Sequence, residues 1–218
     1  MNKGLRYKTP EGPEVEFQSG SRGRVLRNLR GITKKTEMDS AEYKALLRAQ
    51  KIYLGLVGPE SRFTAGMIQE MHRRWLGGIY SWAGTYRTVE LQKGSFRWPP
   101  AFRVGDNMQA FEDGILRLNT PCPTGSPEVV ARRMAEVHGE LLLIHPFRDG
   151  NGRLARWVAD LMALQAGLPA PKYAFEGYKQ RVSRDVYLAA VTRAYGQDYE
   201  ALADFFTKAI EARLAEGP

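Results

Sequence analysis

Residues 144–157 read IHPFRDGNGRLARW, a charged and glycine-rich stretch between two apolar segments. The flanking segments, MAEVHGELLLI and VADLMALQAGL, both have the apolar spacing of buried helices. Pro146 disfavours a helical conformation in the residue before it, so the first helix is expected to end there, and the next to begin near Asn151 or Gly152. The stretch therefore predicts a loop between two buried helices that leads into a helix N-terminus.

The end of this loop suits a bound polyphosphate. The first backbone N–H groups of a helix have no partner within it and carry positive partial charge, which makes phosphate a natural ligand. Gly150 and Gly152 allow backbone conformations and close approaches that other residues do not. Arg153 and Arg156 are three residues apart on one face of the expected helix, and each offers a planar fork for phosphate oxygens.

Two other side chains in the loop add metal and acid–base chemistry. One carboxylate, here Asp149, together with phosphate oxygens makes a typical Mg²⁺ shell. Histidine side chains in general titrate near neutral pH, and His145 can take a proton from a hydroxyl. Taken singly, these features have ordinary structural explanations: a core or cap histidine, arginines on a solvated face, and a common GNG turn, with Phe147 as an aromatic plug. Together they indicate transfer of a phosphorus-centred group to a hydroxyl.

Helical patterns fill most of the remaining chain. One helix is expected from about residue 37 with Asp39 or Ser40 as its N-cap, and a second follows Thr64 as its cap and stops at Gly77-Gly78. Further helices are expected over 101–118, 126–144, from the loop to Gly167, 180–195 and 198–214. The fold class predicted from these patterns is all-α.

The buried faces follow from apolar residues at helical spacing. The helix that leads into the loop starts favourably at Ser126-Pro127-Glu128, with a cap, a proline in the first position and an acid in the first turn. The expected faces are, in chain order, Tyr43, Leu46, Leu47 and Leu54; Ile68, Met71 and Trp75; Val130, Met134, Val137, Leu141 and Ile144; and Leu154, Val158, Leu161 and Met162.

Two regions depart from the helical pattern. Residues 84–104 contain strand-favouring side chains around a Lys-Gly pair, which predicts one small β-hairpin at about 86–98, closed by Pro99-Pro100. Residues 1–23 are rich in glycine, proline, serine and charge, which predicts an extended or poorly ordered arm.

Length and composition bound the class of protein. The chain has 218 residues, enough for one domain with additions, and no apolar run approaches the roughly 20 residues that span a membrane. The N-terminus shows no secretory signal, and the single cysteine, Cys122, excludes an intrachain disulfide, so a cytoplasmic location is expected. The net charge of +8 is partly local to 21–35, a run that either binds an acidic partner or nucleic acid, or forms a solvated face.

The segment HPFRDGNGRLAR, residues 145–156, resembles the signature of Fic-domain proteins, H-x-F-x-(D/E)-G-N-G-R-x-x-R. The resemblance extends over about 24–206 through VLRNLRGIT, IYSWAGTYRTVELQKGSFRW and RDVYLAAV, and we place the Fic domain at 24–214. It implies a Fic fold, a helical bundle with a hairpin flap. It also implies transfer of AMP from ATP to a Ser, Thr or Tyr hydroxyl of a target protein, with release of pyrophosphate. The fixed positions of the signature are His145, Phe147, Asp149, Gly150, Asn151, Gly152, Arg153 and Arg156.

The resemblance also implies roles for these residues. Asn151 and the backbone N–H groups of Gly150 and Gly152 would form the anion hole, while Arg153 and Arg156 would orient the β- and γ-phosphates. These five residues are accordingly expected to bind ATP.

His145 would deprotonate the target hydroxyl, Asp149 would hold Mg²⁺ against the phosphates, and Tyr187 would help to line the adenine pocket. The hairpin would serve as the family's flap, aligning the target segment by strand-like main-chain pairing. The flap residues are Lys93, Gly94, Ser95 and Phe96.

A second motif of the family concerns inhibition of the transferase activity. Many relatives carry an inhibitory helix with (S/T)-x-x-x-E-(G/N), whose glutamate pairs with the second motif arginine, here Arg156. Thr33…Glu37 and Thr207…Glu211 have the spacing, but neither is followed by Gly or Asn. A separate small antitoxin, as in the family's toxin–antitoxin class, is therefore the expected inhibitor, and self-AMPylation is a further expectation.

Other readings stay open at this point. Some Fic relatives transfer phosphate, UMP or phosphocholine, and those that phosphorylate depart from the signature at its second glycine and neighbouring positions, whereas Gly152 and Arg153 are intact here. A nucleic-acid module built on 21–35 would leave the motif unexplained and lacks any zinc-finger or RNP pattern. Secretion as an effector into a host cell is the alternative to a cytoplasmic location. His72 and His138 are expected to be structural.

Overall fold

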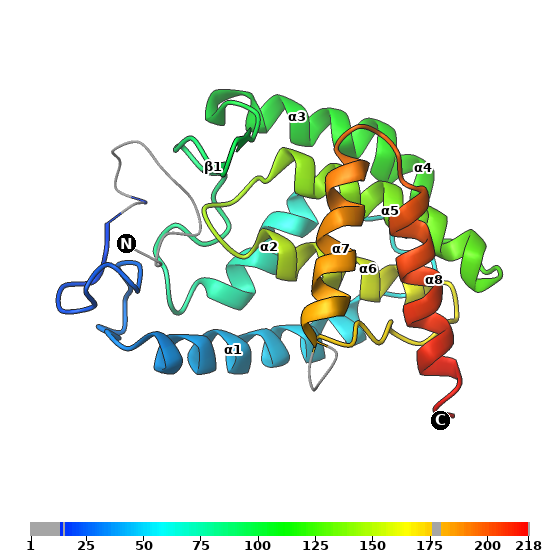
Figure 1. Ribbon diagram of the computed structural model, residues 1–218, viewed down its shortest axis with the longest axis horizontal. Coiled ribbons are helices and arrows are strands. Elements are labelled where there is room, and N and C mark those ends of the chain that lie inside the picture. The colour runs from blue at the N-terminus through cyan, green and yellow to red at the C-terminus, as the bar shows by residue number, and fades with distance from the viewer. Residues whose placement is uncertain (1–13, 15, 176–179, 218) are drawn as a thin grey trace. The chain divides into compact units, whose positions relative to one another are not determined.

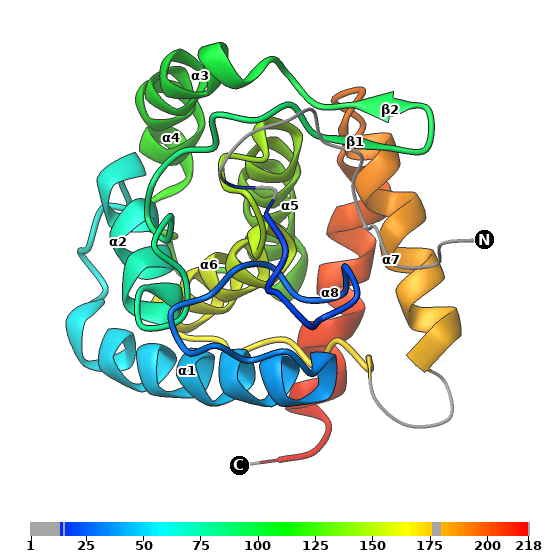
Figure 2. The ribbon, with the colours of Figure 1, turned by 90° about the vertical axis from the view of Figure 1, so that its left-hand side faces the viewer.

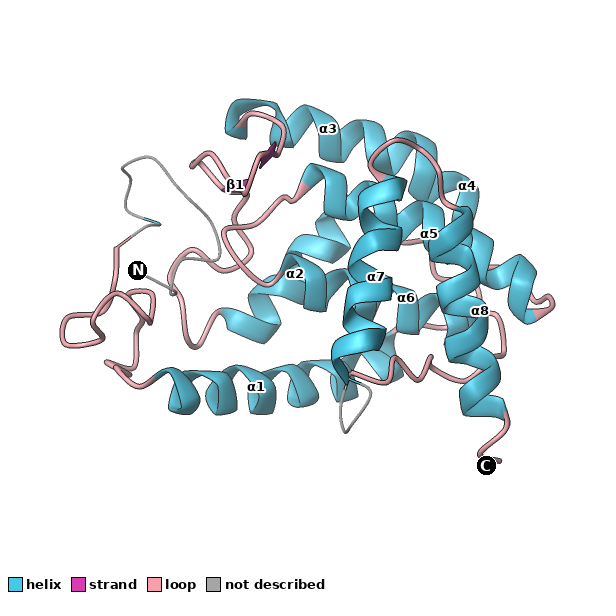
Figure 3. Cartoon of the chain, in the orientation of Figure 1, coloured by secondary structure: helices cyan, strands magenta, loops and turns pink. Residues whose placement is uncertain are grey.

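The computed structural model describes residues 14, 16–175 and 180–217, which are mostly helical apart from one pair of short strands (Figure 3). Residues 1–13 and 15 of the predicted N-terminal arm lie outside this description. The chain divides into two compact units. Unit 1 contains the described residues up to Gly55, Ala65–Met108 and Ile144–Asn151, and unit 2 contains Leu56–Thr64, Gln109–Leu143 and the described residues from Gly152 onward.

Helix α1, Lys35–Leu56, begins before either predicted cap, and Asp39 lies inside it, paired with Lys35 one turn earlier. The predicted face was also wrong, because Tyr43, Leu47 and Leu54 are exposed and Leu46 is only partly buried. The face that packs inward consists of Met38, Glu42, Ala45, Ala49 and Tyr53.

Hydrogen bonds explain why this face of α1 is buried. The Glu42 carboxylate accepts the Tyr80 hydroxyl at 2.6 Å, and the Glu42 carbonyl accepts Nε1 of Trp75 at 2.9 Å. A buried carboxylate is tolerated only when it has such partners, and the two alanines on the same face permit close approach. The partners lie far along the chain, so helical spacing alone did not indicate this face.

Helix α2, Ala65–Leu76, matches its prediction closely. It begins directly after Thr64 and ends before Gly77, and Ile68, Met71 and Trp75 are all buried. Its buried face positions the loop described below.

The predicted hairpin exists but is shorter than 86–98. Strand β1, Gln92–Lys93, pairs antiparallel with β2, Phe96–Arg97, and Figure 2 shows the two strands side by side across a tight turn. Gly94 in that turn has a φ of 60°, which glycine adopts readily. The remaining hairpin residues are irregular, although Val89, Leu91 and Trp98 form a small buried cluster with Phe96 against it.

The predicted helix over 101–118 is a helical run of changing geometry. A 3₁₀ turn at Ala101–Arg103 leads into α3, Val104–Phe111, followed by a π-helical segment, Glu112–Leu116, and the short α4, Arg117–Asn119. A helical run here was predicted correctly, but the widened π segment was not.

Helix α5, Pro127–Ile144, and helix α6, Asn151–Gln165, belong to unit 2 except for Ile144 and Asn151. Both confirm the predicted starts, and every residue of their predicted faces is buried. A hydrogen bond from the Ser126 side chain lowers the pKa of Glu128 in the first turn of α5. Gly167 ends α6 with a φ of 79°, and the Leu168 amide reaches back to the Ala163 carbonyl at 2.9 Å, a Schellman end.

Helices α7, Gln180–Ala194, and α8, Glu200–Leu214, lie side by side within unit 2 (Figure 1) and agree with the predicted pair. Aromatic rings from both helices and from the segment before α7 pack together, namely Tyr173, Phe175, Tyr187, Phe205 and Phe206. No helix among the residues described is long and apolar enough to cross a membrane.

Candidate active site

The loop that follows α5 has a course fixed by its own side chains. His145 has a φ of 53°, in the left-handed region that residues other than glycine seldom adopt. The side chain of Asn151 closes the loop, because Oδ1 accepts the Phe147 amide at 3.0 Å and Nδ2 donates to the Phe147 carbonyl at 2.7 Å. Phe147 is fully buried, as an aromatic plug should be. Asn151 therefore shapes the backbone that carries His145.

His72 of α2 connects this loop to another part of unit 1. Its Nδ1 accepts the Gly84 amide at 2.8 Å, so Nε2 bears the proton and donates it to the Asp149 carbonyl at 3.1 Å. The His72 ring also stacks on Phe147, with 3.9 Å between ring centroids. The side chain is fully buried and structural, as expected, but the structure that it supports is the motif loop itself.

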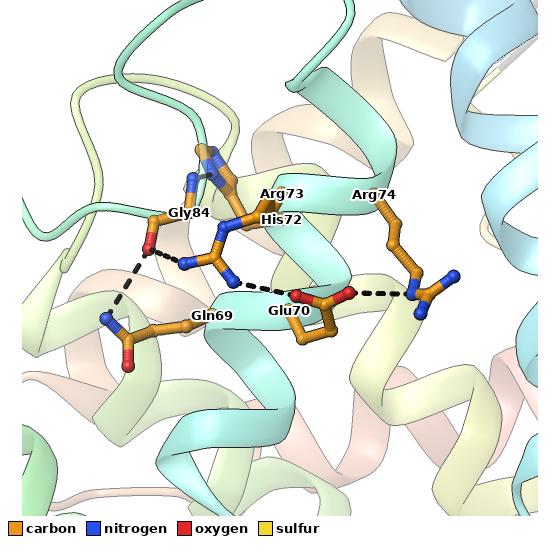
Figure 4. Close-up of polar contacts among 6 residues, drawn as sticks. All are labelled: Gln69, Glu70, His72, Arg73, Arg74 and Gly84. Carbon is orange, nitrogen blue, oxygen red and sulfur yellow. Dashed lines mark hydrogen bonds and ion pairs between the residues drawn. The ribbon is translucent and has the colours of Figure 1, made fainter.

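Helix α2 holds Gly84 at its carbonyl as well as at its amide (Figure 4). The side chains of Gln69 and Arg73 point to the Gly84 carbonyl, at 3.4 and 3.5 Å. Glu70 pairs with Arg73 at 2.7 Å and with Arg74 at 2.8 Å on the same helix. Gly84 has a φ of 77°, and a Cβ there would lie 2.6 Å from Cβ of Arg73. Only glycine fits at this position.

Gly150 is held just as closely. Its φ is 86°, and a Cβ would lie 2.9 Å from Cζ3 of Trp75 and 3.4 Å from Nε2 of His72. Its amide donates to Oδ1 of the neighbouring Asp149 at 2.6 Å. In this structure the amide predicted for the anion hole is therefore engaged by the carboxylate that was predicted to hold a metal.

The hairpin packs against the ring of His145. Trp98 lies tilted over it, with 4.2 Å between ring centroids, and the Trp98 amide donates to the Leu91 carbonyl at 3.1 Å. The hairpin is a two-stranded sheet, so each strand has an outer edge to which no other described strand is paired. Its exposed tip consists of Lys93, Gly94 and Ser95.

In unit 2, Arg156 lies over two aromatic rings. Its guanidinium carbon is 5.2 Å from the centroid of Phe175 and 5.7 Å from that of Tyr187, distances typical of cation–π contacts. The Tyr173 hydroxyl donates to Asp160 at 2.6 Å, and burial raises the pKa of Asp160 to about 6, although this hydrogen bond and the charge of Arg156 act in the opposite direction. The second motif arginine and Tyr187, the predicted adenine contact, are therefore neighbours.

The ring of His138 supports this arrangement through its contact with Tyr187. Its Nε2 is 2.8 Å from the Tyr187 hydroxyl, and the ring is buried. Burial, and then repulsion by Arg156, lower the pKa of His138 to about 3, and the backbone of Ala155 opposes the shift. The imidazole is neutral at physiological pH and fixes Tyr187 as a hydrogen-bond partner, which agrees with the predicted structural role.

The predicted site residues divide between the units, because the motif crosses from one to the other inside α6. Unit 1 holds His145, Asp149, Gly150 and Asn151 together with the flap residues Lys93, Gly94, Ser95 and Phe96. Unit 2 holds Gly152, Arg153, Arg156 and Tyr187.

The described residues contain no group of three or more His, Cys, Asp or Glu side chains that could hold a metal ion. Asp149 offers one carboxylate, and a Mg²⁺ ion beside it would take its other ligands from phosphate oxygens and water. This donor set fits a metal that arrives with a nucleotide.

The sequence reasoning missed Arg87. The residue is almost completely buried, and its amide donates to the Pro146 carbonyl at 2.9 Å. Burial lowers the pKa of Arg87, which the charges of Glu90 and Glu14 oppose. The sequence did contain a signal for this residue, which is an arginine within the strand-favouring run Tyr86-Arg87-Thr88-Val89. Charged side chains are rarely buried, so a charge in a run of this kind can indicate a special role.

Residues 62–163 match the profile of the Fic/DOC family. The chain is 32% identical over 203 residues to the probable protein adenylyltransferase Fic of Salmonella typhimurium, covering 88% of this chain and 91% of that protein. It is 25% identical over 211 residues to protein adenylyltransferase VbhT of Bartonella schoenbuchensis, covering 97% of this chain but only 41% of VbhT. The chain therefore spans less than half the length of some relatives.

The fold resembles that of solved structures. The BepC protein of Bartonella tribocorum, a VirB-translocated effector crystallised with bound AMPPNP, superposes with a TM-score of 0.72 over 91% of this chain and 98% of that one. At 18% sequence identity this likeness shows the fold alone.

Proposed function

The chain belongs to the Fic/DOC family, and we propose that it is a protein adenylyltransferase that transfers AMP from ATP to a Ser, Thr or Tyr hydroxyl of a target protein. The observation that best supports the proposal is the complete set of motif residues in 145–156, on a loop whose backbone is fixed by Asn151 and His72. The relatives named as protein adenylyltransferases support the same activity.

In the proposed reaction, His145 accepts the proton of the target hydroxyl as its oxygen attacks the α-phosphorus of ATP. The bond from that phosphorus to the bridging oxygen breaks, and pyrophosphate leaves on the opposite side. Asp149 would hold Mg²⁺, which neutralises phosphate charge when it is bound. Asp149 now accepts the Gly150 amide, so nucleotide binding would exchange this contact for one to phosphate.

Nucleotide recognition is assigned to the first turn of α6 and to the aromatic group of unit 2. The amides of Gly150 and Gly152, with Asn151, would form the anion hole, and Arg153 and Arg156 would orient the β- and γ-phosphates. Tyr187 would line the adenine pocket, where the contact of its ring with Arg156 gives it a fixed place.

The target protein would bind to the hairpin. Its strands have unpaired edges within the described sheet, so an extended segment can add to one of them by main-chain hydrogen bonds. The contact between Trp98 and His145 would keep that segment close to the candidate base. Lys93, Gly94, Ser95 and Phe96 would contact the target.

We assign the activity to a toxin restrained by a separate antitoxin, acting in the bacterial cytoplasm and able to modify itself. Transfer into a host cell as an effector is the alternative location, and BepC is named as a VirB-translocated effector. Nucleic acid is not a proposed ligand.

The direct test is labelled ATP with Mg²⁺, the purified chain and a cell lysate, followed by mass spectrometry of whatever protein becomes labelled. We expect the added mass to be that of AMP, and we expect the His145→Ala variant to label nothing while retaining ATP affinity, because the base is lost and the phosphate contacts remain. An added phosphate would contradict AMP transfer, and so would full activity in His145→Ala. A transferase of UMP or phosphocholine would leave every protein unlabelled, because ATP carries neither group.

Gly152 provides a second test that separates binding from folding. Among the residues that the structure describes, a Cβ at this position would meet only Nη1 of Arg156, at 3.8 Å. The residue lies in a helix, so alanine should leave stability unchanged or raise it by up to about 1 kcal/mol. Inside an anion hole, however, the methyl group would occupy space needed by a phosphate. We therefore expect Gly152→Ala to lose at least about tenfold in ATP affinity, with urea stability unchanged or slightly raised. Unchanged affinity would contradict the anion hole.

A further inference from the structure

Arg87 places one guanidinium group among backbone carbonyls from two separate segments. Nε donates to the His145 carbonyl at 2.8 Å, and Nη2 donates to the Ile144 carbonyl at 3.4 Å. Nη1 donates to the Val89 carbonyl at 3.0 Å, and Nη2 to the Pro99 carbonyl at 2.6 Å. Ile144 directly precedes the candidate base His145, so the first two acceptors belong to the motif loop. Val89 and Pro99 lie on either side of the hairpin.

The contacts of Arg87 extend beyond its side chain. Its own amide donates to the Pro146 carbonyl at 2.9 Å, so three consecutive carbonyls, those of Ile144, His145 and Pro146, all point to one residue. The peptide groups on both sides of His145 are thereby held while its φ stays at 53°. A residue in this sparsely populated conformation persists only when its surroundings fix it, and Arg87 supplies that constraint.

From these contacts we propose that Arg87 is a positioning residue that joins the hairpin to the backbone of His145, so that the two keep one geometry. The inference rests on the proposed function: the hairpin would hold the target segment, His145 would take the proton, and Arg87 would set the distance between hydroxyl and imidazole. The planar fork is required, because its N–H donors lie on three nitrogens spread around one plane and reach carbonyls of two segments, whereas the three donors of an ammonium group share one nitrogen.

The charge of Arg87 fits this role. It is an almost completely buried cation whose hydrogen bonds all go to carbonyl oxygens, with Glu90 and Glu14 near enough to act on it electrostatically. Buried carbonyl groups that lose a donor are destabilising, because their contacts with water are not restored. Loss of the guanidinium would therefore release both segments together, and not only the hairpin.

The test compares Arg87→Lys and Arg87→Ala with Tyr80→Phe as the matched control. Tyr80→Phe removes a buried hydrogen bond of unit 1, to Glu42, that touches neither the hairpin nor the loop. For Arg87→Ala we expect kcat to fall about 100-fold with ATP affinity nearly unchanged, and for Arg87→Lys about tenfold or more, as for a misplaced reacting group. Tyr80→Phe should keep kcat at matched folded fraction.

Chemical rescue separates positioning from general loss of structure. Ethylguanidinium replaces the atoms that Arg87→Ala lacks, and it should restore part of the kcat of that variant, whereas ethylammonium, with equal charge and no fork, should not. No rescue of Arg87→Ala, together with wild-type kcat in Arg87→Lys, would overturn the proposal.

Amide hydrogen exchange provides a readout that needs no activity. In both Arg87 variants, exchange should rise together in peptides covering 89–98 and 144–151, and in Tyr80→Phe it should rise in neither. A rise confined to one of the two peptides, or to neither, would show that Arg87 does not join them. If the wild-type chain labels no protein at all, the proposed function fails, and the exchange experiment still decides the role of Arg87.

Discussion

At the scale of single residues, the buried histidine of unit 2 has a measurable consequence for stability. The folded state keeps His138 neutral down to a pKa of about 3, because burial and the charge of Arg156 oppose protonation. An unfolded chain protonates the same ring near pH 6.5. Below that pH the unfolded state binds the additional proton, so the contribution of His138 is complete above pH 6.5 and is lost as the pH falls toward 3.

We therefore expect the wild-type chain to lose about 2 kcal/mol more stability than His138→Gln between pH 7 and pH 5. Glutamine can still bond to the Tyr187 hydroxyl but does not titrate. Asp160, whose pKa is raised and whose contribution has the opposite sign, is present in both proteins and cancels in the difference. Urea unfolding at the two pH values measures this. Parallel losses in the two proteins would show that His138 is not the group responsible.

For two further residues, the sequence indicated a role but not the hydrogen-bond partners through which the residue performs it. His72 was predicted to be structural, and it is buried, but its partners, the Gly84 amide and the Asp149 carbonyl, could not be named. Asn151 was identified from the motif, yet its two bonds to Phe147 give it a part in shaping the loop that the motif does not reveal. In both cases the residue type indicated that the residue matters, whereas the sequence did not indicate its hydrogen-bond partners.

At the scale of elements, the loop and the hairpin contain glycines of similar backbone conformation but different surroundings. Gly150 and Gly94 both have positive φ, 86° and 60°. A Cβ at Gly94 would meet no atom of the described residues within 4 Å, whereas at Gly150 it would overlap the ring of Trp75. Trp75 cannot move aside easily, because its Nε1 is bonded to the Glu42 carbonyl at 2.9 Å.

For Gly94→Ala we expect a loss of about 1 kcal/mol, from backbone strain alone. For Gly150→Ala we expect a loss of about 3 kcal/mol or more, since overpacking adds to the strain. Urea unfolding of both variants measures the difference. Equal losses would mean that the loop can move away from α2 without cost, and the close fit around Gly150 would then have no energetic meaning.

Local sequence patterns were sufficient to predict some helices but not others. The start of α5 at Pro127 and the buried faces of α5 and α6 were predicted correctly, because caps and helical spacing act within one element. The face of α1 was wrong, since the hydrogen bonds of Glu42 to Tyr80 and Trp75 decide it. The prediction made the strands of the hairpin too long. Several strand-favouring residues there pack into a buried cluster but do not pair with an opposite strand.

At the scale of the whole molecule, two carboxylates bear on how the proposed activity is restrained. Glu37 and Glu211 stand at the two places with the spacing of the inhibitory motif, and both are exposed, the first in the first turn of α1 and the second on α8. Neither position offers the buried setting in which a carboxylate pairs strongly with an arginine. This favours an inhibitor supplied by another chain.

We expect self-AMPylation of the isolated chain to stay within about twofold of wild type in both Glu37→Gly and Glu211→Gly, because a surface carboxylate contributes little. Incorporation of labelled AMP measures this, with His145→Ala as the blank. A rise of about tenfold or more in either variant, the size of an ordinary regulatory coupling, would place the inhibitor within the chain.

The sequence by itself determined the helical class, the starts of most helices, the hairpin's position and the motif with its family. Each of these depends on residues close together in the chain, through caps, turns and spacing. Tertiary structure alone decided what holds the motif in place: His72 reaches Asp149 across 77 positions, and Arg87 reaches His145 across 58. The physical reason is that a buried hydrogen-bond donor must find an acceptor somewhere, but its residue type does not specify which distant carbonyl the fold will bring to it.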